Sequence, residues 1–321
     1  MRKKVTIIAA VLLALIIVIV VVLTSNDDKV KEVIIGNQDS KEQDIIGELM
    51  KQLLEDRGFK VQLVSGLSPV GLREGMEAAT IDICAGYTGM AWREHLGHER
   101  KPGMDNNELY RLVKQEDHGN GLIWLKPMWN NKTYALASWA SFSVEHGLTT
   151  LSDLASLYRE KEGEIRTSVC YEFGIRTDGL PALKKHYNFE IAESSLQIES
   201  SLKTSGQSLK KRECDVAMVS GTDPAIYENK WYVYADHKDF FPPYDLTPYV
   251  RREIIDKYSE IPGILNELVG TFPGGGVRAT PEIVAECRRV WQKLNLKVDV
   301  EEMEPAEVAH EYLVEHGLVK E

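Results

Sequence analysis

Residues 33–64 read VIIGNQDSKEQDIIGELMKQLLEDRGFKVQLV, and their succession of apolar and amphipathic runs decides the fold class. The run 33–36 is short, apolar and followed by turn-forming residues, which predicts a strand. Residues 42–57 repeat apolar side chains at helical spacing, which predicts an amphipathic helix. Residues 60–64 predict a second strand. The segment therefore reads as one βαβ unit and indicates an α/β protein.

The same alternation continues to the end of the chain, in two groups of elements without a polar linker between them. This pattern indicates two α/β lobes between which the chain crosses and then returns. The ligand is then expected between the lobes, because open α/β sheets bind ligands at the carboxyl ends of their strands. We expect helices at 69–78, 104–115, 149–161, 183–187, 201–212, 280–294 and from 305, and extended segments at 81–84, 124–127, 134–137 and 215–219.

The N-terminal segment predicts a membrane anchor. Residues 5–23 carry no charge over 19 positions, close to the roughly 20 residues with which a helix crosses a bilayer. Three basic residues precede this run and two aspartates follow it, which predicts a cytoplasmic N-terminus and an extracytoplasmic remainder. The β-branched run at 16–22 favours an uncleaved anchor over a cleaved signal. We expect residues 1–28 to form the cytoplasmic start and the transmembrane helix.

Charge and cysteine content limit the classes of function. The formal net charge of the 321 residues is −11, and it becomes −14 without the three basic residues at the N-terminus. A nucleic-acid partner is not expected, since phosphate binding needs a basic surface. Cys84, Cys170, Cys214 and Cys287 are scattered and lack the spacing of a metal site. An oxidising location permits a bridge between Cys170 and Cys214, but separate buried thiols are the more common outcome in a chain of this size.

Catalytic and cofactor motifs are absent from the sequence. It has no G-x-S-x-G, no H-E-x-x-H and no phosphate-binding loop of the Walker type. His95 and His98 lie three apart on an expected helix beside acidic residues, a spacing that fits either a metal site or an ordinary solvated helix face. The solvated face is the commoner origin of such clusters. We expect no enzyme activity, no metal and no cofactor.

Tyrosines sit at the ends of predicted strands, where a cleft between two lobes is expected. Tyr87, Tyr134 and Tyr244 occupy such positions, within the strings GYTG at 86–89, TYALA at 133–137 and DFFPPY at 239–244. Any one of these tyrosines, taken alone, is more often a packing residue than a ligand contact. Their occurrence together, in this order along the chain, is what makes them candidates for a binding site.

These strings resemble the osmoprotectant substrate-binding proteins of ABC importers, which take up glycine betaine, carnitine, choline and proline betaine. The likeness extends over roughly residues 32–319 and includes LSDLA at 151–155 and PAEVA at 305–309. It implies a two-lobed periplasmic-binding-protein fold of type II with a double crossover hinge, preceded here by one N-terminal transmembrane helix. We expect residues 29–131 plus 238–321 to form lobe I and residues 132–237 to form lobe II.

The resemblance also implies a binding site. In such proteins a trimethylammonium group is held in a cage of tyrosine rings, because a cation without N–H donors is attracted to the negative faces of aromatic rings. Tyr87, Tyr134 and Tyr244 match cage positions. Arg176 matches the arginine that pairs with a betaine carboxylate, a task that suits a guanidinium because its fork binds a carboxylate through two hydrogen bonds.

Several positions depart from the family pattern. Ser220 stands where an aromatic cage residue is usual, 24 residues before Tyr244, and Gln38 stands where lysine or glutamine is found. Lys132 lies two residues before Tyr134, where its charge is expected to repel a cationic ligand. Tyr171 is a candidate replacement for the missing ring, although a single aromatic residue is more often used for packing.

The sequence therefore predicts an extracytoplasmic, membrane-anchored substrate-binding subunit that works with an ABC permease and its ATPase. Two alternatives keep the same fold: a membrane-tethered solute sensor, and an importer subunit for a different small polar solute. A fold alone does not distinguish them. An extracytoplasmic enzyme is disfavoured, since no nucleophile and base occur in a recognisable motif.

Overall fold

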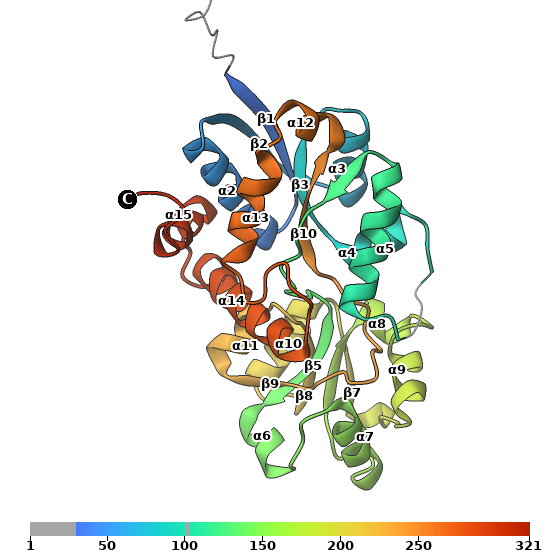
Figure 1. Cartoon of the computed structure of the whole chain (residues 1–321). Helices are drawn as coiled ribbons and strands as arrows, with labels where there is room; N and C mark the ends of the chain where they lie inside the picture. Colours follow the sequence, from blue (N-terminus) through green and yellow to red (C-terminus); the bar gives the residue numbers. More distant parts are fainter. Residues whose placement is uncertain (1–29, 100–102) are drawn as a thin grey trace, which may run out of the picture.

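The computed structural model describes residues 30–99 and 103–321 (Figure 1). The membrane anchor predicted at residues 5–23 lies outside these ranges. Within them, no helix has both the length and the apolar composition needed to span a bilayer.

The first sheet has five strands in the order β2-β1-β3-β10-β4. β1 is parallel to β2 and to β3, whereas β10 is antiparallel to both β3 and β4. The apolar side chains of the first predicted helix, among them Ile45, Leu49 and Leu53, are fully buried in the core beneath this sheet, as its periodicity predicts. The elements are β1 Lys31–Gln38, α2 Lys41–Asp56, β2 Phe59–Leu67, α3 Pro69–Glu77, β3 Ile83–Tyr87, β4 Leu122–Trp124 and β10 Leu246–Arg251.

The second sheet repeats this arrangement in the order β7-β6-β8-β5-β9. β6 is parallel to β7 and to β8, and β5 is antiparallel to β8 and β9. Its strands are β5 Tyr134–Trp139, β6 Thr167–Cys170, β7 Leu196–Glu199, β8 Val216–Ser220 and β9 Trp231–Val233. Its helices are α6 Ala140–Glu145, α7 Leu151–Glu160, α8 Tyr171–Ile175, α9 Leu180–Tyr187, η2 Glu193–Ser195, α10 Leu202–Lys210 and α11 Pro224–Asn229.

The chain passes between the two sheets twice. It leaves the first sheet after β4 and enters the second at β5, and it returns from β9 to β10. The connecting segments are residues 125–133 and 234–245. The lobe boundaries expected between residues 131 and 132 and between residues 237 and 238 fall inside these segments, and we keep them as our proposed division.

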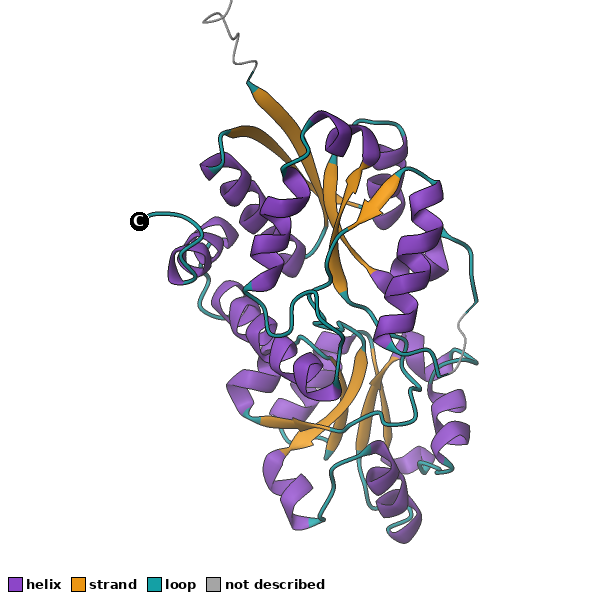
Figure 2. Ribbon diagram, viewed as in Figure 1, coloured by secondary structure: helices purple, strands orange, loops and turns teal. Residues whose placement is uncertain are grey.

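Helices flank both faces of each sheet (Figure 2). α14 links the two halves, because it packs against α2 of the first half and α11 of the second (Figure 1). The remaining elements are α4 Thr88–Met90, η1 Ala91–His95, α5 Asn106–Gly119, α12 Arg252–Lys257, α13 Ile261–Gly270, α14 Pro281–Asp299 and α15 Pro305–Glu315.

Two features considered from the sequence have plain structural roles. η1 is a π-helix that ends at His95, so His98 lies beyond it rather than on one helix with His95. The His98 ring stacks on Trp92, with 3.9 Å between ring centroids, and bonds Glu116 at 2.7 Å. No group of three metal-binding side chains occurs in the part of the chain that the structure describes. All four cysteines are buried, free thiols.

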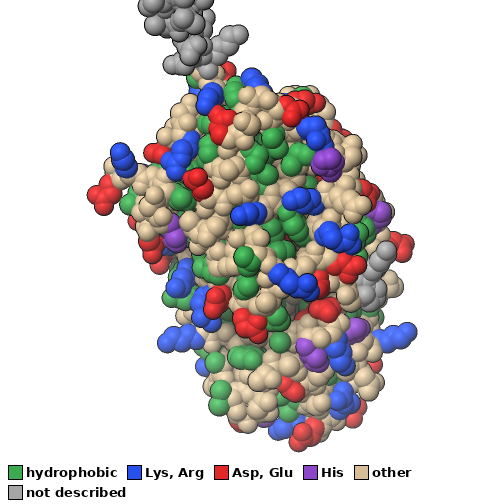
Figure 3. Space-filling view, viewed as in Figure 1, with side chains coloured by type: hydrophobic (Ala, Val, Ile, Leu, Met, Phe, Trp, Pro, Cys, Tyr) green, Lys and Arg blue, Asp and Glu red, His purple; other side chains and the backbone are tan. Residues whose placement is uncertain are grey.

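Acidic and basic side chains are interspersed over the face seen in Figure 3. Together with the formal net charge of −11, this mixture gives no basic patch on that face.

Candidate functional site

The candidate residues lie at the edges of the two sheets where the chain crosses between them. In both sheets the parallel strands end at this edge, and the antiparallel strand β5 begins there, so strand termini from both halves face the same region. Gln38 ends β1, Tyr87 ends β3, Ser220 ends β8, Tyr134 begins β5, Tyr244 closes the second connecting segment, and Tyr171 and Arg176 lie at the two ends of α8.

Tyr87 is held by a buried carboxylate. Its hydroxyl donates to Glu42 Oε1 at 2.8 Å, and Glu42 also accepts from Asn130 Nδ2 at 3.0 Å and from Asn295 Nδ2 at 3.1 Å. Glu42 is 2% exposed. Burial, together with this carboxylate, raises the pKa of Tyr87 well above its ordinary value. The tyrosine is therefore a neutral donor with a fixed ring.

Lys132 lies beside this pair. Its Nζ is 3.9 Å from Glu42 Oε2 and 3.5 Å from the Tyr87 hydroxyl oxygen, but 5.4 Å from the centre of the Tyr87 ring. The ammonium group thus approaches the hydroxyl end of the tyrosine rather than the centre of its face. The repulsion expected from Lys132 is offset by the adjacent carboxylate, since the two charges sum to zero.

Glu42 is a site residue to which the sequence analysis assigns no role. Its position in the sequence could have marked it as a candidate. Glu42 lies in the first turn of the helix that follows β1, and this turn lies at the ligand-binding edge of an α/β sheet. Its partners Asn130 and Asn295 come from the first connecting segment and from α14, so the carboxylate joins three distant parts of the chain.

Tyr134 and Ser220 are brought together directly, because they are opposite each other in the antiparallel pair β5–β8. The Tyr134 ring packs edge-on against Phe173, with 5.6 Å between ring centroids. Burial raises its pKa. Ser220 Oγ is buried and makes no hydrogen bond with any described residue. The serine therefore occupies the position next to the ring, where the family pattern has an aromatic side chain.

Tyr244 is fixed by the first connecting segment. Its N–H donates to Asn131 Oδ1 at 2.9 Å, and its carbonyl accepts from the Lys132 N–H at 2.8 Å. Gly89 lies against it so closely that a Cβ there would be 2.6 Å from the ring and 2.4 Å from the Pro243 carbonyl oxygen. The glycine of the GYTG string is thus required by the approach of Tyr244.

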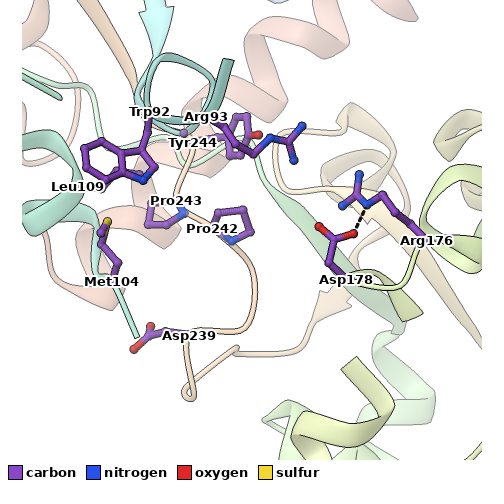
Figure 4. Close-up of a pocket in the computed structure, with 11 residues that line it drawn as sticks. Trp92, Arg93, Met104, Leu109, Arg176, Asp178, Asp239, Pro242, Pro243 and Tyr244 are labelled. Atoms are coloured by element: carbon purple, nitrogen blue, oxygen red, sulfur yellow. Dashed lines mark hydrogen bonds and ion pairs between the residues drawn. The ribbon is translucent and has the colours of Figure 1, made fainter. Parts of the chain in front are cut away.

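Tyr244 and Arg176 line one pocket between the two halves (Figure 4). Its empty volume is about 560 Å³, part of which is open to solvent. Arg176 Nε donates to Asp178 at 2.5 Å and its Nη1 donates to Glu172 at 3.0 Å. The other lining residues are Gly89, Trp92, Arg93, Met104, Leu109, Asp178, Asp239, Pro242 and Pro243.

The last two candidates differ in burial. Gln38 is 8% exposed, and its Nε2 contacts Met90 Sδ at 3.3 Å. Tyr171 is 56% exposed. Gln38 is therefore buried beside Met90, whereas more than half of the Tyr171 side chain is exposed, and neither residue lines the pocket that Tyr244 and Arg176 share.

Asp245 ties the two connecting segments together. Its Oδ1 accepts from the Asn131 N–H at 3.1 Å and its Oδ2 accepts from Asn106 Nδ2 at 2.6 Å. Burial raises the pKa of Asp245 to about 6. A carboxyl group that titrates near neutrality thus lies inside the hinge.

The known proteins to which this chain is similar are binding proteins of transport systems. Residues 31–315 match the family described as the substrate-binding domain of the ABC-type glycine betaine transport system. A glycine-betaine-binding protein of Pseudomonas aeruginosa is 30% identical over 291 residues, which cover 89% of this chain and 88% of that protein. The carnitine transport binding protein OpuCC of Listeria monocytogenes is 28% identical over 282 residues, which cover 87% of this chain and 85% of that protein.

Solved structures share the fold. The structure of apo YehZ from Escherichia coli has a TM-score of 0.74 and 24% identity, and covers 91% of this chain and 100% of its own. The crystal structure of a glycine betaine/carnitine/choline ABC transporter protein has a TM-score of 0.77 and 24% identity, with coverages of 89% and 99%. The two-sheet α/β architecture is thus that of the periplasmic-binding-protein-like fold.

Proposed function

We propose that this chain, which belongs to the family of substrate-binding domains of ABC-type glycine betaine transport systems, closes its two lobes around a quaternary-ammonium solute held by tyrosine rings. It is the substrate-binding protein of an osmoprotectant ABC importer and acts outside the cytoplasm. Its family consists of transport proteins rather than enzymes.

The observation that supports this ligand class is the position of tyrosines at the facing strand ends of both sheets, with Tyr244 lining the pocket between them. Tyr87 comes from lobe I, Tyr134 from lobe II and Tyr244 from the segment that joins them. A quaternary cation has no N–H to donate, so ring faces are its natural partners, and each contact contributes roughly 0.5–2 kcal/mol once water is excluded. The neutral Glu42–Lys132 pair leaves the cation to be selected by the rings.

The carboxylate of a betaine would meet Arg176 from lobe II. Relatives are named for glycine betaine and for carnitine, both of which carry a carboxylate as well as a quaternary nitrogen. Lobe closure around such a ligand would present one compact surface to the ABC permease, which with its ATPase completes the importer.

We propose that lobe I comprises residues 29–131 plus 238–321 and lobe II residues 132–237. Residues 1–28 would tether the protein to the membrane as a single-pass anchor, since 5–23 are uncharged and follow three basic residues. The tether would hold the binding domain on the extracytoplasmic side, near its permease.

An importer subunit for a different small polar solute is the second candidate. Ser220 Oγ and Asn295 Oδ1 are buried without a hydrogen-bond partner among residues 30–99 and 103–321. Buried polar atoms of this kind favour a ligand that offers hydrogen-bonding groups. A membrane-tethered sensor would use the same cleft without a permease.

Ligand titration tests the proposal. The chain is titrated with glycine betaine, choline, carnitine, proline betaine and neutral amino acids, and binding is followed by tryptophan fluorescence and by heat. We expect saturable binding of quaternary amines, weakened about 2- to 30-fold in Tyr134→Leu by loss of one ring contact. Tyr227→Leu is the matched control, because Tyr227 is 41% exposed on α11. Binding of amino acids without any quaternary amine would favour the second candidate instead.

A further inference from the structure

Two arginines from opposite lobes line the pocket beside Tyr244. Arg93 comes from η1 in lobe I, and Arg176 comes from the end of α8 in lobe II. Figure 4 shows the Arg93 and Arg176 side chains extending toward one another on one side of the pocket. Asp178 and Asp239 line the same pocket, and Asp178 is already bonded to Arg176, so Arg93 is the guanidinium of this lining that can attract a further anionic group.

Arg176 has one donor in use on each edge of its guanidinium. Its Nε and Nη1 are already bonded to Asp178 and Glu172, which together carry two negative charges against one positive charge. A carboxylate is normally bound through two parallel N–H groups of one guanidinium. With both edges of its fork in use, Arg176 alone is a poor receptor for a ligand carboxylate.

Arg93 is the less committed of the two arginines. Its hydrogen bond within the described part of the chain goes to Glu94, the adjacent residue, at 3.5 Å. Its side chain is 41% exposed, so it can reorient toward a ligand at low cost. The guanidinium therefore retains most of its donors at the pocket wall.

The backbone explains why Arg93 reaches this wall. η1 closes with an i→i+5 hydrogen bond from the Leu96 N–H to the Ala91 carbonyl at 2.9 Å. Short π-helical segments are rare and are frequent at functional sites. The π-helix η1 directly follows residues 87–90, which lie against Tyr244. Within η1, Trp92 is buried to 7% exposure, whereas the side chain of Arg93 is left at the rim of the pocket.

The surroundings strengthen a charge interaction at this point. Trp92, Met104, Leu109, Pro242 and Pro243 give the pocket an apolar floor, where Coulomb interactions are larger than in water. Burial raises the pKa of Tyr244, and the positive charge of the neighbouring Arg93 opposes that rise.

We propose that Arg93 is a second carboxylate-binding residue of this site, acting across the cleft from Arg176, and that the chain therefore selects zwitterionic onium solutes over choline-like cations. This inference rests on the proposed function, since it assumes that the quaternary nitrogen is bound among the tyrosines. It adds that both lobes contact the anionic end of the ligand. Lobe closure would then be favoured most by ligands that carry both charges.

Arg93→Gln tests the inference, because glutamine removes the charge and the fork while keeping a polar side chain. Binding of glycine betaine, carnitine and choline to the full chain is measured by calorimetry. We expect affinities for glycine betaine and carnitine to fall about tenfold or more, and choline affinity to stay within about threefold or to rise. Arg93→Lys should recover part of the loss, since it keeps the charge without the fork.

The control is Arg289→Gln, an exposed arginine on α14 that does not line the pocket, for which no change is expected. Equal losses for all three ligands in Arg93→Gln, or no loss for any, would overturn the role of Arg93 while leaving the importer function intact. A wild-type chain that binds none of the three ligands would overturn the proposed ligand class, and this inference with it.

Discussion

Tyr87 of lobe I and Tyr134 of lobe II are the same kind of residue at the same edge of the cleft, but they are held very differently. Tyr87 is 5% exposed and donates its hydroxyl to the buried carboxylate of Glu42. Tyr134 is only partly buried and packs edge-on against Phe173, beside Ser220, whose Oγ has no partner within the described ranges.

The difference indicates that the two walls of the cleft are ordered to different extents before a ligand binds. In the proposed site, the lobe I wall is already ordered by its own hydrogen bonds, so ligand binding there would order few groups and cost little entropy. The lobe II wall leaves polar atoms and ring surface to be completed by a ligand and by closure.

Removing the carboxylate that holds the lobe I wall should have the largest effect. In Glu42→Ala, Tyr87, Asn130 and Asn295 lose a common acceptor and Lys132 loses its counter-ion. We expect the free energy of unfolding to fall by about 3–5 kcal/mol, measured by chemical denaturation. Glu286→Ala, at an exposed position of α14, should change it by less than about 0.5 kcal/mol. A loss below about 1 kcal/mol at Glu42 would remove the basis of the contrast.

The hinge between the two walls should respond to pH through Asp245. Its pKa is raised from 3.8 to about 6 in the folded chain, so the folded state binds the proton more tightly than the unfolded state. The stability that this proton contributes is fully present below pH 4 and is lost as the pH rises through 6.

The difference between the two pKa values corresponds to about 3 kcal/mol. Asp245→Asn cannot ionise and offers one acceptor oxygen instead of two, so it should lose a constant amount of stability. Against this constant loss, it should gain on wild type by up to about 3 kcal/mol between pH 4 and pH 7. Denaturation curves at several pH values measure this gain. Asp256→Asn, an exposed control, should follow wild type at every pH. A constant difference between Asp245→Asn and wild type would show that the hinge carboxyl does not titrate in this range.

The smallest effect is expected from removing the hydroxyl groups of Tyr87 and Tyr134 one at a time. Tyr87→Phe removes a donor from a buried carboxylate and should cost about 1.5–3 kcal/mol of stability. Tyr134→Phe should cost less than about 0.5 kcal/mol, because its ring contact with Phe173 is kept. The pair is measured side by side by thermal or chemical unfolding. Equal costs, or a larger cost at Tyr134, would contradict the difference between the walls.

Strongly periodic elements of the fold could be predicted from the sequence. α2 has an apolar stripe with the helical period, and its capping Ser40 accepts from the Gln43 N–H, so its bounds agree with prediction to one residue at each end. α14 begins at Pro281 after the capping Thr280, as a cap followed by a proline predicts.

Other elements could not be predicted, for reasons visible in their residues. β10 contains Pro248, and a proline usually excludes a segment from the middle of a sheet. Here β10 lies between β3 and β4, and the Pro248 carbonyl accepts the Leu125 N–H beyond the end of β4. β6, β7 and β9 have only three or four residues each, too few to show an alternation.

The residues of the candidate site likewise divide into those that could be predicted from the sequence and those that could not. The tyrosines lie in short strings that resemble a family, so single positions could be named. Glu42 and its partners could not, because Asn130 is 88 residues away and Asn295 is 253 residues away in sequence. Only the folded chain brings these polar groups together.

α14 has a mechanical consequence. Its Gln292 and Asn295 donate to the carbonyls of Gly221 and Thr222 in lobe II, and Asn295 also reaches Glu42 in lobe I. In the proposed closing motion the pivot would lie next to the tyrosines, and the lobes would act as two lever arms. A rotation that shifts the rings only slightly displaces the outer rims much further. A small displacement caused by a solute at the pivot would thereby become a larger movement of the outer surfaces that a permease could recognise.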